Sequence, residues 1–187
     1  MYRKGDSLDD FILFDRIWTR VWQQQGFELE FTRRDADCYL ILSEDGEAAG
    51  TVEFKRYDSG RHPLDALAPF SEHPALAPGK AVEVDKVALL PEYRGRNLDK
   101  LISLIVHYCE NRGCTHIVAL MEPKLCKALR MAFRIKLERI AEPFHYKGGM
   151  VVPVVCDVSR LYLNKHGYGW LLPNPEQPEI VLPAVGS

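Results

Sequence analysis

Apolar side chains near the N-terminus recur with the period of a helix. Residues three or four positions apart share one face of a helix, and an apolar face of this kind packs against a core. Ser7 and Asp10 have the spacing of a capping box, although Asp replaces the preferred Glu or Gln, and Gly26 is a suitable stop. The apolar face consists of Phe11, Phe14, Ile17, Trp18, Val21 and Trp22. This pattern predicts an amphipathic helix.

Two segments of alternating apolar and polar residues follow and predict a β-hairpin around the turn "EDGE". Together they read "DCYLILSEDGEAAGTVEFKRY". The next stretch, from Ser59 to Lys80, contains four prolines: Pro63, Pro69, Pro74 and Pro78. A loop of this length inside a compact domain is usually functional or disordered.

The segment "VEVDKVALLPEYRGRNLDKLI" predicts a strand, a basic turn and a helix. The helix from Leu98 to Arg112 has one apolar face, and Gly113 is placed to end it. The turn is Arg94-Gly95-Arg96-Asn97. Because a helix N-terminus has unpaired N–H groups and a partial positive charge, this turn is a candidate phosphate site. The alternative is a solvated turn whose arginines face water. The sequence of this turn matches neither the Walker phosphate-binding loop nor the glycine-rich dinucleotide-binding loop.

The remaining pattern predicts a buried strand "THIVALM", a helix "EPKLCKALRMAFR", and two closing strands in "IKLERI" and "GGMVVPVVCDV". The order of elements predicts an α/β (α+β) fold, with a mixed central sheet flanked by helices and a parallel pair around the central crossover. We expect one domain over residues 1–166 and a loose proline-rich tail over 167–187.

Composition excludes several classes of protein. The 187 residues carry 24 basic and 26 acidic side chains, so no basic excess indicates nucleic-acid binding. The five cysteines have no C-x-x-C spacing and fit reduced thiols in a cytoplasmic protein. No apolar run is long enough to span a membrane, and no signal peptide is evident. The six histidines have no metal-ligand spacing, so we expect no metal site.

Several segments resemble one superfamily. The strand, turn and helix "VALLPEYRGRNLDKLI" resemble the pantetheine-binding region of GNAT acyltransferases, with Arg94 at the first motif position but Asn97 and Asp99 in place of glycines. "VEVDKVAL" resembles the central strand of acyl-homoserine-lactone synthases and N-acyl amino acid synthases. "HIVALMEPKLCKALRMAFRIKLERIAEPFHYKGG" and "RIWTRVWQQQGFE" are similar to further segments of that branch. The resemblance covers about Arg16 to Asp157 and implies a GNAT-like fold.

The resemblance also implies roles for individual residues. Glu83 would accept the proton of an amine or hold the amine, and Lys86 would bind the acceptor's carboxylate. The alternative for Glu83 is a surface charge between two valines. The backbone of Val87, Ala88 and Leu89 would bind the pantetheine arm and the thioester oxygen, and Arg94, Gly95, Arg96 and Asn97 would contact the donor's phosphate.

Arg16 and Trp22 would bind substrate at the N-terminal clamp, although Trp22 also fits plain core packing. An apolar slot for an acyl chain would have the first helix and the Pro63–Pro78 loop as its walls.

The expected donor is an acyl-phosphopantetheine on acyl carrier protein, or acyl-coenzyme A, with no tightly bound cofactor. The two missing glycines favour the carrier protein, whose arm has a single phosphodiester. The basic side of the helix "EPKLCKALRMAFR" and the residues after it is a candidate docking face for an acidic carrier protein. The alternative is an ordinary solvated face. The basic side consists of Lys124, Lys127, Arg130, Arg134 and Lys136.

The predicted activity is transfer of a medium or long acyl chain to the amine of an amino acid or similar metabolite. Many acetyltransferases of the superfamily have a tyrosine that acts as general acid on the helix after the second central strand. The corresponding segment here, from Met121 to Arg134, contains no tyrosine. The alternatives are a coenzyme A-dependent acetyltransferase and a silent module that binds an acyl group or a partner.

Overall fold

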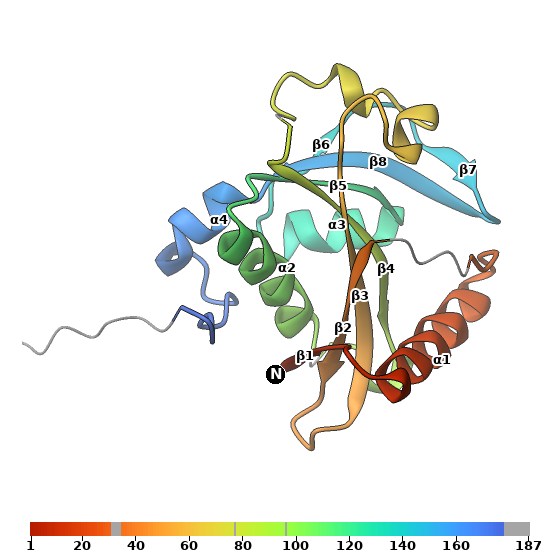
Figure 1. The fold of residues 1–187 in the computed structure, drawn as a ribbon, viewed down its shortest axis with the longest axis vertical. Helices are drawn as coiled ribbons and strands as arrows, with labels where there is room; N and C mark the ends of the chain where they lie inside the picture. The colour runs from red at the N-terminus through yellow and green to blue at the C-terminus, as the bar shows by residue number, and fades with distance from the viewer. Residues whose placement is uncertain (31–34, 77, 96, 178–187) are drawn as a thin grey trace, which may run out of the picture.

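The computed structural model describes residues 1–30, 35–76, 78–95 and 97–177 (Figure 1). The strands are β1 (Tyr2–Lys4), β2 (Ala36–Leu42), β3 (Ala48–Arg56), β4 (Ala81–Leu89), β5 (His116–Met121), β6 (Glu138–Arg139), β7 (Phe144–Tyr146) and β8 (Gly149–Asp157). The α-helices are α1 (Leu8–Gln25), α2 (Leu98–Arg112), α3 (Pro123–Met131) and α4 (Ser159–Leu163). Short 3-10 helices are η1 (Pro63–Ala66), η2 (Phe70–Glu72), η3 (Pro91–Tyr93) and η4 (Lys165–Gly167).

The eight described strands form a mixed sheet in the order β1-β2-β3-β4-β5-β8-β6, and β7 pairs with β8. β4 and β5 run parallel, joined by a crossover through α2, whereas β2, β3 and β4 form an antiparallel meander. The predicted hairpin and the predicted parallel pair are both confirmed. The fold class is therefore the expected mixed sheet with flanking helices.

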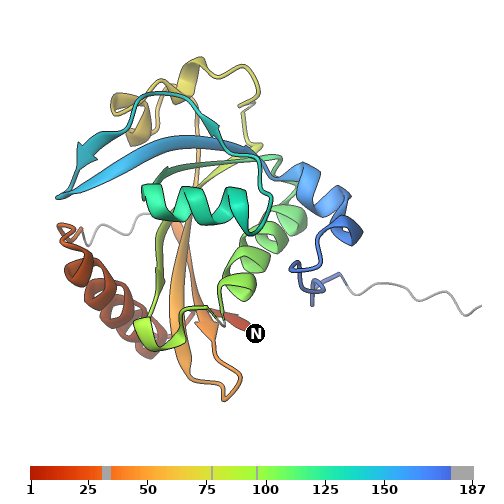
Figure 2. The same cartoon turned by 180° about the vertical axis from the view of Figure 1, so that it is seen from behind.

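Helices cover both faces of this sheet, as the two opposite views show (Figures 1 and 2). Side chains alternate between the faces along each strand. On β2, Cys38 and Leu40 pack with α1, whereas Tyr39 and Ile41 pack with α2. The segment between β3 and β4 covers the α1 face farther along, against Val118 and its neighbours. α1 therefore lies across the sheet from α2 and α3.

The predicted helix ends are confirmed for the first two helices. Ser7 Oγ accepts a hydrogen bond from the N–H of Asp10 at 3.1 Å, so the capping residue is in place. Gly26 and Gly113 follow α1 and α2 with positive φ values of 81° and 65°, which glycine adopts without strain. α3 ends at Met131, earlier than the apolar pattern indicated.

Three expectations need correction. The proline-rich segment is ordered through its described residues and forms η1 and η2, because Leu64 and Phe70 are buried in a small core of their own. The strand predicted in "IKLERI" is only Glu138–Arg139. The tail is not loose as far as residue 177, since the N–H of Leu172 bonds Ser103 Oγ at 3.0 Å and Trp170 packs on Phe133. Residues 178–187 lie outside the described part.

No described helix combines the length and apolar character needed to cross a membrane.

Candidate functional site

The site begins where two parallel strands separate. β4 and β5 pair only at their start, through Ala81 with His116, Val82 with Ile117 and Glu83 with Val118. Beyond this point β4 continues along β3, and β5 continues along β8. Within the described residues, the facing edges of the two strands therefore have no strand partner past Glu83 on β4 and Val118 on β5, so their backbone groups are available to a ligand.

A β-bulge shapes β4 directly after this point. Thr51 pairs with Ala88 and Glu53 pairs with Asp85, so Lys86 and Val87 together oppose a single residue of β3. Lys86 adopts a φ of 45°, which is uncommon for a residue with a side chain. Thr51 Oγ1 donates to the carbonyl of Lys86 at 2.8 Å and stabilises the bulge.

The bulge buries the side chain of Lys86, which is 4% exposed. Its ammonium lies 2.6 Å from Oε2 of the fully buried Glu53 and 5.6 Å from the ring centre of Trp18. A buried charge needs such a partner because leaving water is costly. Lys86 was predicted to bind an acceptor carboxylate, and Glu53, which the sequence did not indicate, already occupies its ammonium.

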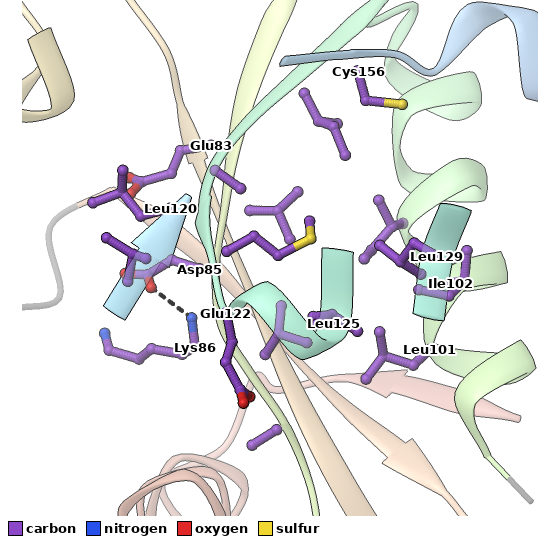
Figure 3. Close-up of a pocket in the computed structure, with 18 of the residues that line it drawn as sticks. Glu83, Asp85, Lys86, Leu101, Ile102, Leu120, Glu122, Leu125, Leu129 and Cys156 are labelled. Carbon is purple, nitrogen blue, oxygen red and sulfur yellow. Dashed lines mark hydrogen bonds between the residues drawn. The ribbon is translucent and has the colours of Figure 1, made fainter. Parts of the chain in front are cut away.

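A cavity of about 1290 Å³ extends from the separated strands in two directions (Figure 3). This exceeds the roughly 300–1,000 Å³ of an ordinary small-molecule pocket. Glu83 and Asp85 lie on one side of the cavity, and Ile102 and Leu129 lie on the other. We call these the polar end and the apolar chamber.

The polar end centres on Glu83. Its Oε2 lies 3.5 Å from Lys55 Nζ and 3.4 Å from His62 Nε2. Lys55 is shared, because its ammonium also lies 2.6 Å from Asp85 Oδ2 and 3.5 Å from Glu53 Oε2. Burial and the nearby Asp85 raise the pKa of Glu83 to about 7, although Lys55 opposes them. Glu83 can therefore bind and release a proton near neutral pH.

The cations and imidazole around Glu83 have shifted pKa values of their own. Burial lowers the pKa of Lys55, but Asp85 and Glu83 outweigh it, so the net change is upward and Lys55 stays charged. Burial lowers the pKa of His62, which favours its neutral form.

The apolar chamber lies between α2, α3 and the sheet. Its lining includes Leu101, Ile102, Ile105, Leu125, Ala128, Leu129, Ile135, Leu137, Met121, Cys156, Val158 and Leu161. The walls expected from the sequence, α1 and the proline-rich segment, contribute at the opposite end through Trp22, Pro63 and Leu67. The prediction for the walls was thus incomplete, because residues on the α2 face look like ordinary core until the chamber is seen.

The predicted donor loop lies at the margin of the cavity. Val87, Ala88, Leu89, Arg94 and Gly95 all line it. Arg94 Nε donates to the carbonyl of Leu89 at 3.2 Å, which ties the loop to the end of β4. Arg96 lies outside the described residues.

Asn97 is 2% exposed, and its Nδ2 donates to the carbonyl of Tyr93 at 3.2 Å. Its Oδ1 has no hydrogen-bond partner among the described residues. A buried acceptor in this state favours a ligand or water that donates a hydrogen bond.

The two residues of the predicted clamp separate in the structure. Trp22 lines the cavity and packs edge-on against Trp18 at 5.0 Å between ring centres. Arg16 is exposed on α1 and is not among the residues that line the cavity. The structure therefore brings together every described candidate residue except Arg16 and Asn97 at one cavity.

A strap of residues 26–30 after α1 lines the polar end through Phe27 and Glu30. The N–H of Glu28 donates to the carbonyl of Lys147 at 2.8 Å, and Lys147 forms an ion pair with Glu30. Phe27 lies over Gly149 so closely that a methyl group there would overlap its ring. The strap thus joins α1 to the turn between β7 and β8, whose Tyr146 and Lys147 also line the cavity.

The chain belongs to the acetyltransferase (GNAT) family, whose model matches residues 10–132. This places it among acyltransferases. None of the curated proteins compared with the sequence matches it.

Solved structures resemble its fold at low identity. FeeM, an N-acyl amino acid synthase from uncultured soil microbes, matches with a TM-score of 0.67 and 15% identity over 85% of this chain and 91% of that one. The AHL synthase LasI matches with a TM-score of 0.64 and 14% identity over 88% and 93%. MesI, a CoA-dependent acyl-homoserine lactone synthase, matches with a TM-score of 0.59 and 14% identity over 79% and 80%.

Sequence reasoning missed His62 and Lys55, both of which contact Glu83. Lys55 stands two residues after Glu53 on the same strand, so a shared face was visible in the sequence. His62 comes from the proline-rich segment, and no local pattern indicated where its side chain would lie.

Proposed function

We propose that the protein is an N-acyltransferase that moves a medium or long acyl chain from acyl carrier protein or acyl-coenzyme A to the amine of an amino acid or similar metabolite. The observation that supports this proposal is that one continuous cavity contains both the ionisable carboxylate of Glu83 and the apolar chamber. Burial of each methylene contributes about 0.8 kcal/mol, so such a chamber favours long chains.

The separated strands supply the donor site in this proposal. Val87, Ala88 and Leu89 line the cavity where β4 has left β5, and the donor would bind to the backbone of this segment. An amide N–H aimed at the thioester oxygen stabilises the negative charge that develops there during attack. Arg94 and Gly95 then lie where the phosphate end of the pantetheine arm would leave the cavity.

Glu83 acts as the general base. It accepts a proton from the acceptor's ammonium group, and the freed amine attacks the thioester carbon. The C–N bond forms, the C–S bond breaks, and the second proton of the amine passes to water. The thiolate leaves and takes a proton from solvent, as a thiol of pKa about 8–9 permits without a protein acid.

The choice of donor rests on the loop before α2. Asn97 fills, with a buried side chain, a position where the family's motif has glycine. This favours the single phosphodiester of a carrier protein over the pyrophosphate of coenzyme A. The basic side chains of α3, including the exposed Lys124 and Lys127, are proposed as the docking face for that acidic partner.

The test is mass spectrometry of organic extracts from cells that express the protein, compared with cells that express Glu83→Ala. We expect new N-acylated amines of long chain with the native protein, and at least a hundredfold less with the variant, because general bases contribute about 10²–10⁴ in rate. Glu44→Ala is the matched control, since Glu44 is exposed in the β2–β3 turn. Only acetylated products would favour the acetyltransferase alternative, and no product from folded protein would favour a silent module.

A further inference from the structure

His62 lies at the start of η1 with both ring nitrogens close to other groups. Its Nδ1 accepts a hydrogen bond from the N–H of Leu64 at 3.3 Å. Its Nε2 lies 3.4 Å from Oε2 of Glu83. A neutral imidazole carries a proton on one nitrogen only, so the acceptor role of Nδ1 places that proton on Nε2. The Nε2–H group is therefore the part of the ring nearest to the carboxylate of Glu83, at an N···O distance of 3.4 Å, slightly longer than a usual hydrogen bond.

The proline-rich segment holds the ring of His62 in this place. The ring packs against Tyr57 with 5.2 Å between centres. Tyr57 in turn donates to Asp65 Oδ1 at 2.7 Å, and the N–H of Gly60 donates to Asp65 Oδ2 at 2.7 Å. Leu64, directly after Pro63, is buried in the small core beneath. These contacts order the segment and place the ring of His62 beside Glu83.

We propose that His62 is a positioning residue for acyl transfer, whose Nε2–H holds the Glu83 carboxylate in place and favours its charged form. A donor that faces the charged form of an acid lowers its pKa. The inference rests on the proposed function only in taking Glu83 as the base.

Other charged groups also face Glu83. Lys55, from β3, is shared, because its ammonium lies 2.6 Å from Asp85 and 3.5 Å from Glu83, and it lowers the pKa of Glu83. The acidic Asp85 and Glu53 both raise the pKa of Glu83. Tyr146, from β7, lines the same cavity. Among the described residues, loss of His62 would leave the carboxylate facing two like charges, with Lys55 as the cation paired with it.

His62 is a fixed donor and does not relay protons. A second proton would have to enter at Nδ1, where the N–H of Leu64 already points. Burial also disfavours the charged imidazolium and lowers its pKa, although Asp65 and Asp58 oppose this. The neutral form of His62 is therefore favoured.

Two variants separate the roles of the two nitrogens. Asn reaches about as far as Nδ1, so His62→Asn keeps a helix-capping acceptor for Leu64 and removes the donor at Glu83. Gln reaches about as far as Nε2, so His62→Gln keeps a donor at Glu83 and loses the cap. The measurement is the pKa of the Glu83 carboxyl by ¹³C NMR titration, with the signal assigned by its loss in Glu83→Gln.

We expect His62→Asn to raise the pKa of Glu83 by on the order of one pH unit, and His62→Gln to raise it less. In active protein, the acid limb of the kcat profile should move by the same amount. An unchanged pKa in His62→Asn, or equal shifts in both variants, would overturn the proposal. Loss of thermal stability in His62→Gln without a shift in His62→Asn would show a structural role alone.

The titration needs no activity, so it separates this inference from the proposed function. If the pKa moves and no acylated product is ever found, the contact stands and the catalytic role of both residues is overturned.

Discussion

At the scale of single residues, Glu83 is placed where its charge is costly and chemically useful. It is 8% exposed, and burial and Asp85 raise its pKa to about 7. Lys55 limits that rise without removing it. A carboxylate in ordinary surroundings would be a weaker base at neutral pH, because catalytic efficiency is greatest when the pKa lies near the working pH.

This placement predicts that Glu83→Gln gains stability as it loses activity. The pKa of Glu83 is higher in the folded state than its ordinary value of 4.5, so the folded protein holds the proton more tightly. The unfolding free energy of the native protein therefore falls as pH rises from about 4.5 to 7, and it stays low above that range. Glu83→Gln lacks this loss. We expect it to be more stable than the native protein by on the order of 1–3 kcal/mol at pH 8 and about equal at pH 4.

Urea unfolding at the two pH values measures the difference. Lys55 keeps Asp85 as a partner in Glu83→Gln, so no cation is left unpaired. Glu44→Gln, at an exposed turn position, should show no such pH-dependent gain. The opposite result would be a Glu83→Gln protein that is less stable than the native protein at pH 8 and closer to it at pH 4. That result would show that Glu83 is a structural ion-pair partner.

At the scale of elements, the sequence predicted what local spacing determines. The ends of α1 and α2 followed from Ser7, Gly26 and Gly113, because caps act on their own backbone. The antiparallel pair β2–β3 followed from the hairpin pattern and the parallel pair β4–β5 from the crossover, whereas β1 and β7 were not predicted. These rules depend on residues that are close in sequence, so the amino-acid sequence alone is enough to apply them.

The site depended on contacts between distant elements, and the sequence showed these less well. The bulge at Lys86 forms against β3 through Glu53, 33 residues earlier. The apolar chamber is lined jointly by α2, α3 and the sheet, and the apolar pattern of either helix alone does not show it. His62 reaches Glu83 only through the packing of η1. The family resemblance therefore indicated Glu83, and the local pattern did not show the groups that surround it.

The strap over the polar end gives a prediction at this scale. A methyl group at Gly149 would overlap the ring of Phe27, which also packs on Trp22 at 5.4 Å between ring centres. We expect Gly149→Ala to displace the strap, to destabilise the protein by about 1–3 kcal/mol, and to raise KM for the amine more than for the acyl donor. Thermal unfolding and steady-state kinetics with each substrate varied measure both effects.

Gly169→Ala is the matched control, since nothing lies within 4 Å of an added methyl group there. Adding Phe27→Ala to Gly149→Ala should recover part of the loss, because the overlapping ring is gone. If Gly149→Ala behaves like Gly169→Ala, the strap adapts freely and does not shape the acceptor end.

At the scale of the whole molecule, the two faces of the sheet supply different parts of the reaction site. α1 and the proline-rich segment bring Trp22 and His62 to the polar end from one face. α2 and α3 form the apolar chamber on the other face. The gap between β4 and β5 joins the two through the sheet. The reacting carbon of a bound acyl group would lie at this gap, with the amine on one side and the chain on the other.

This division predicts that the chamber, not the polar end, sets the length of the acyl chain. Ala128 lines the chamber from α3, so a larger side chain there would fill empty volume and leave the core packing intact. We expect Ala128→Phe to shift the products toward shorter chains, with a loss of roughly fourfold for each methylene excluded, from about 0.8 kcal/mol each. Chain lengths of the products, measured by mass spectrometry, test this. Ala132→Phe, at an exposed position just past α3, should leave the distribution unchanged. If both folded variants give the same acyl-chain lengths as the native protein, the acyl group does not bind in the chamber. The chamber would then have no role in selecting the substrate.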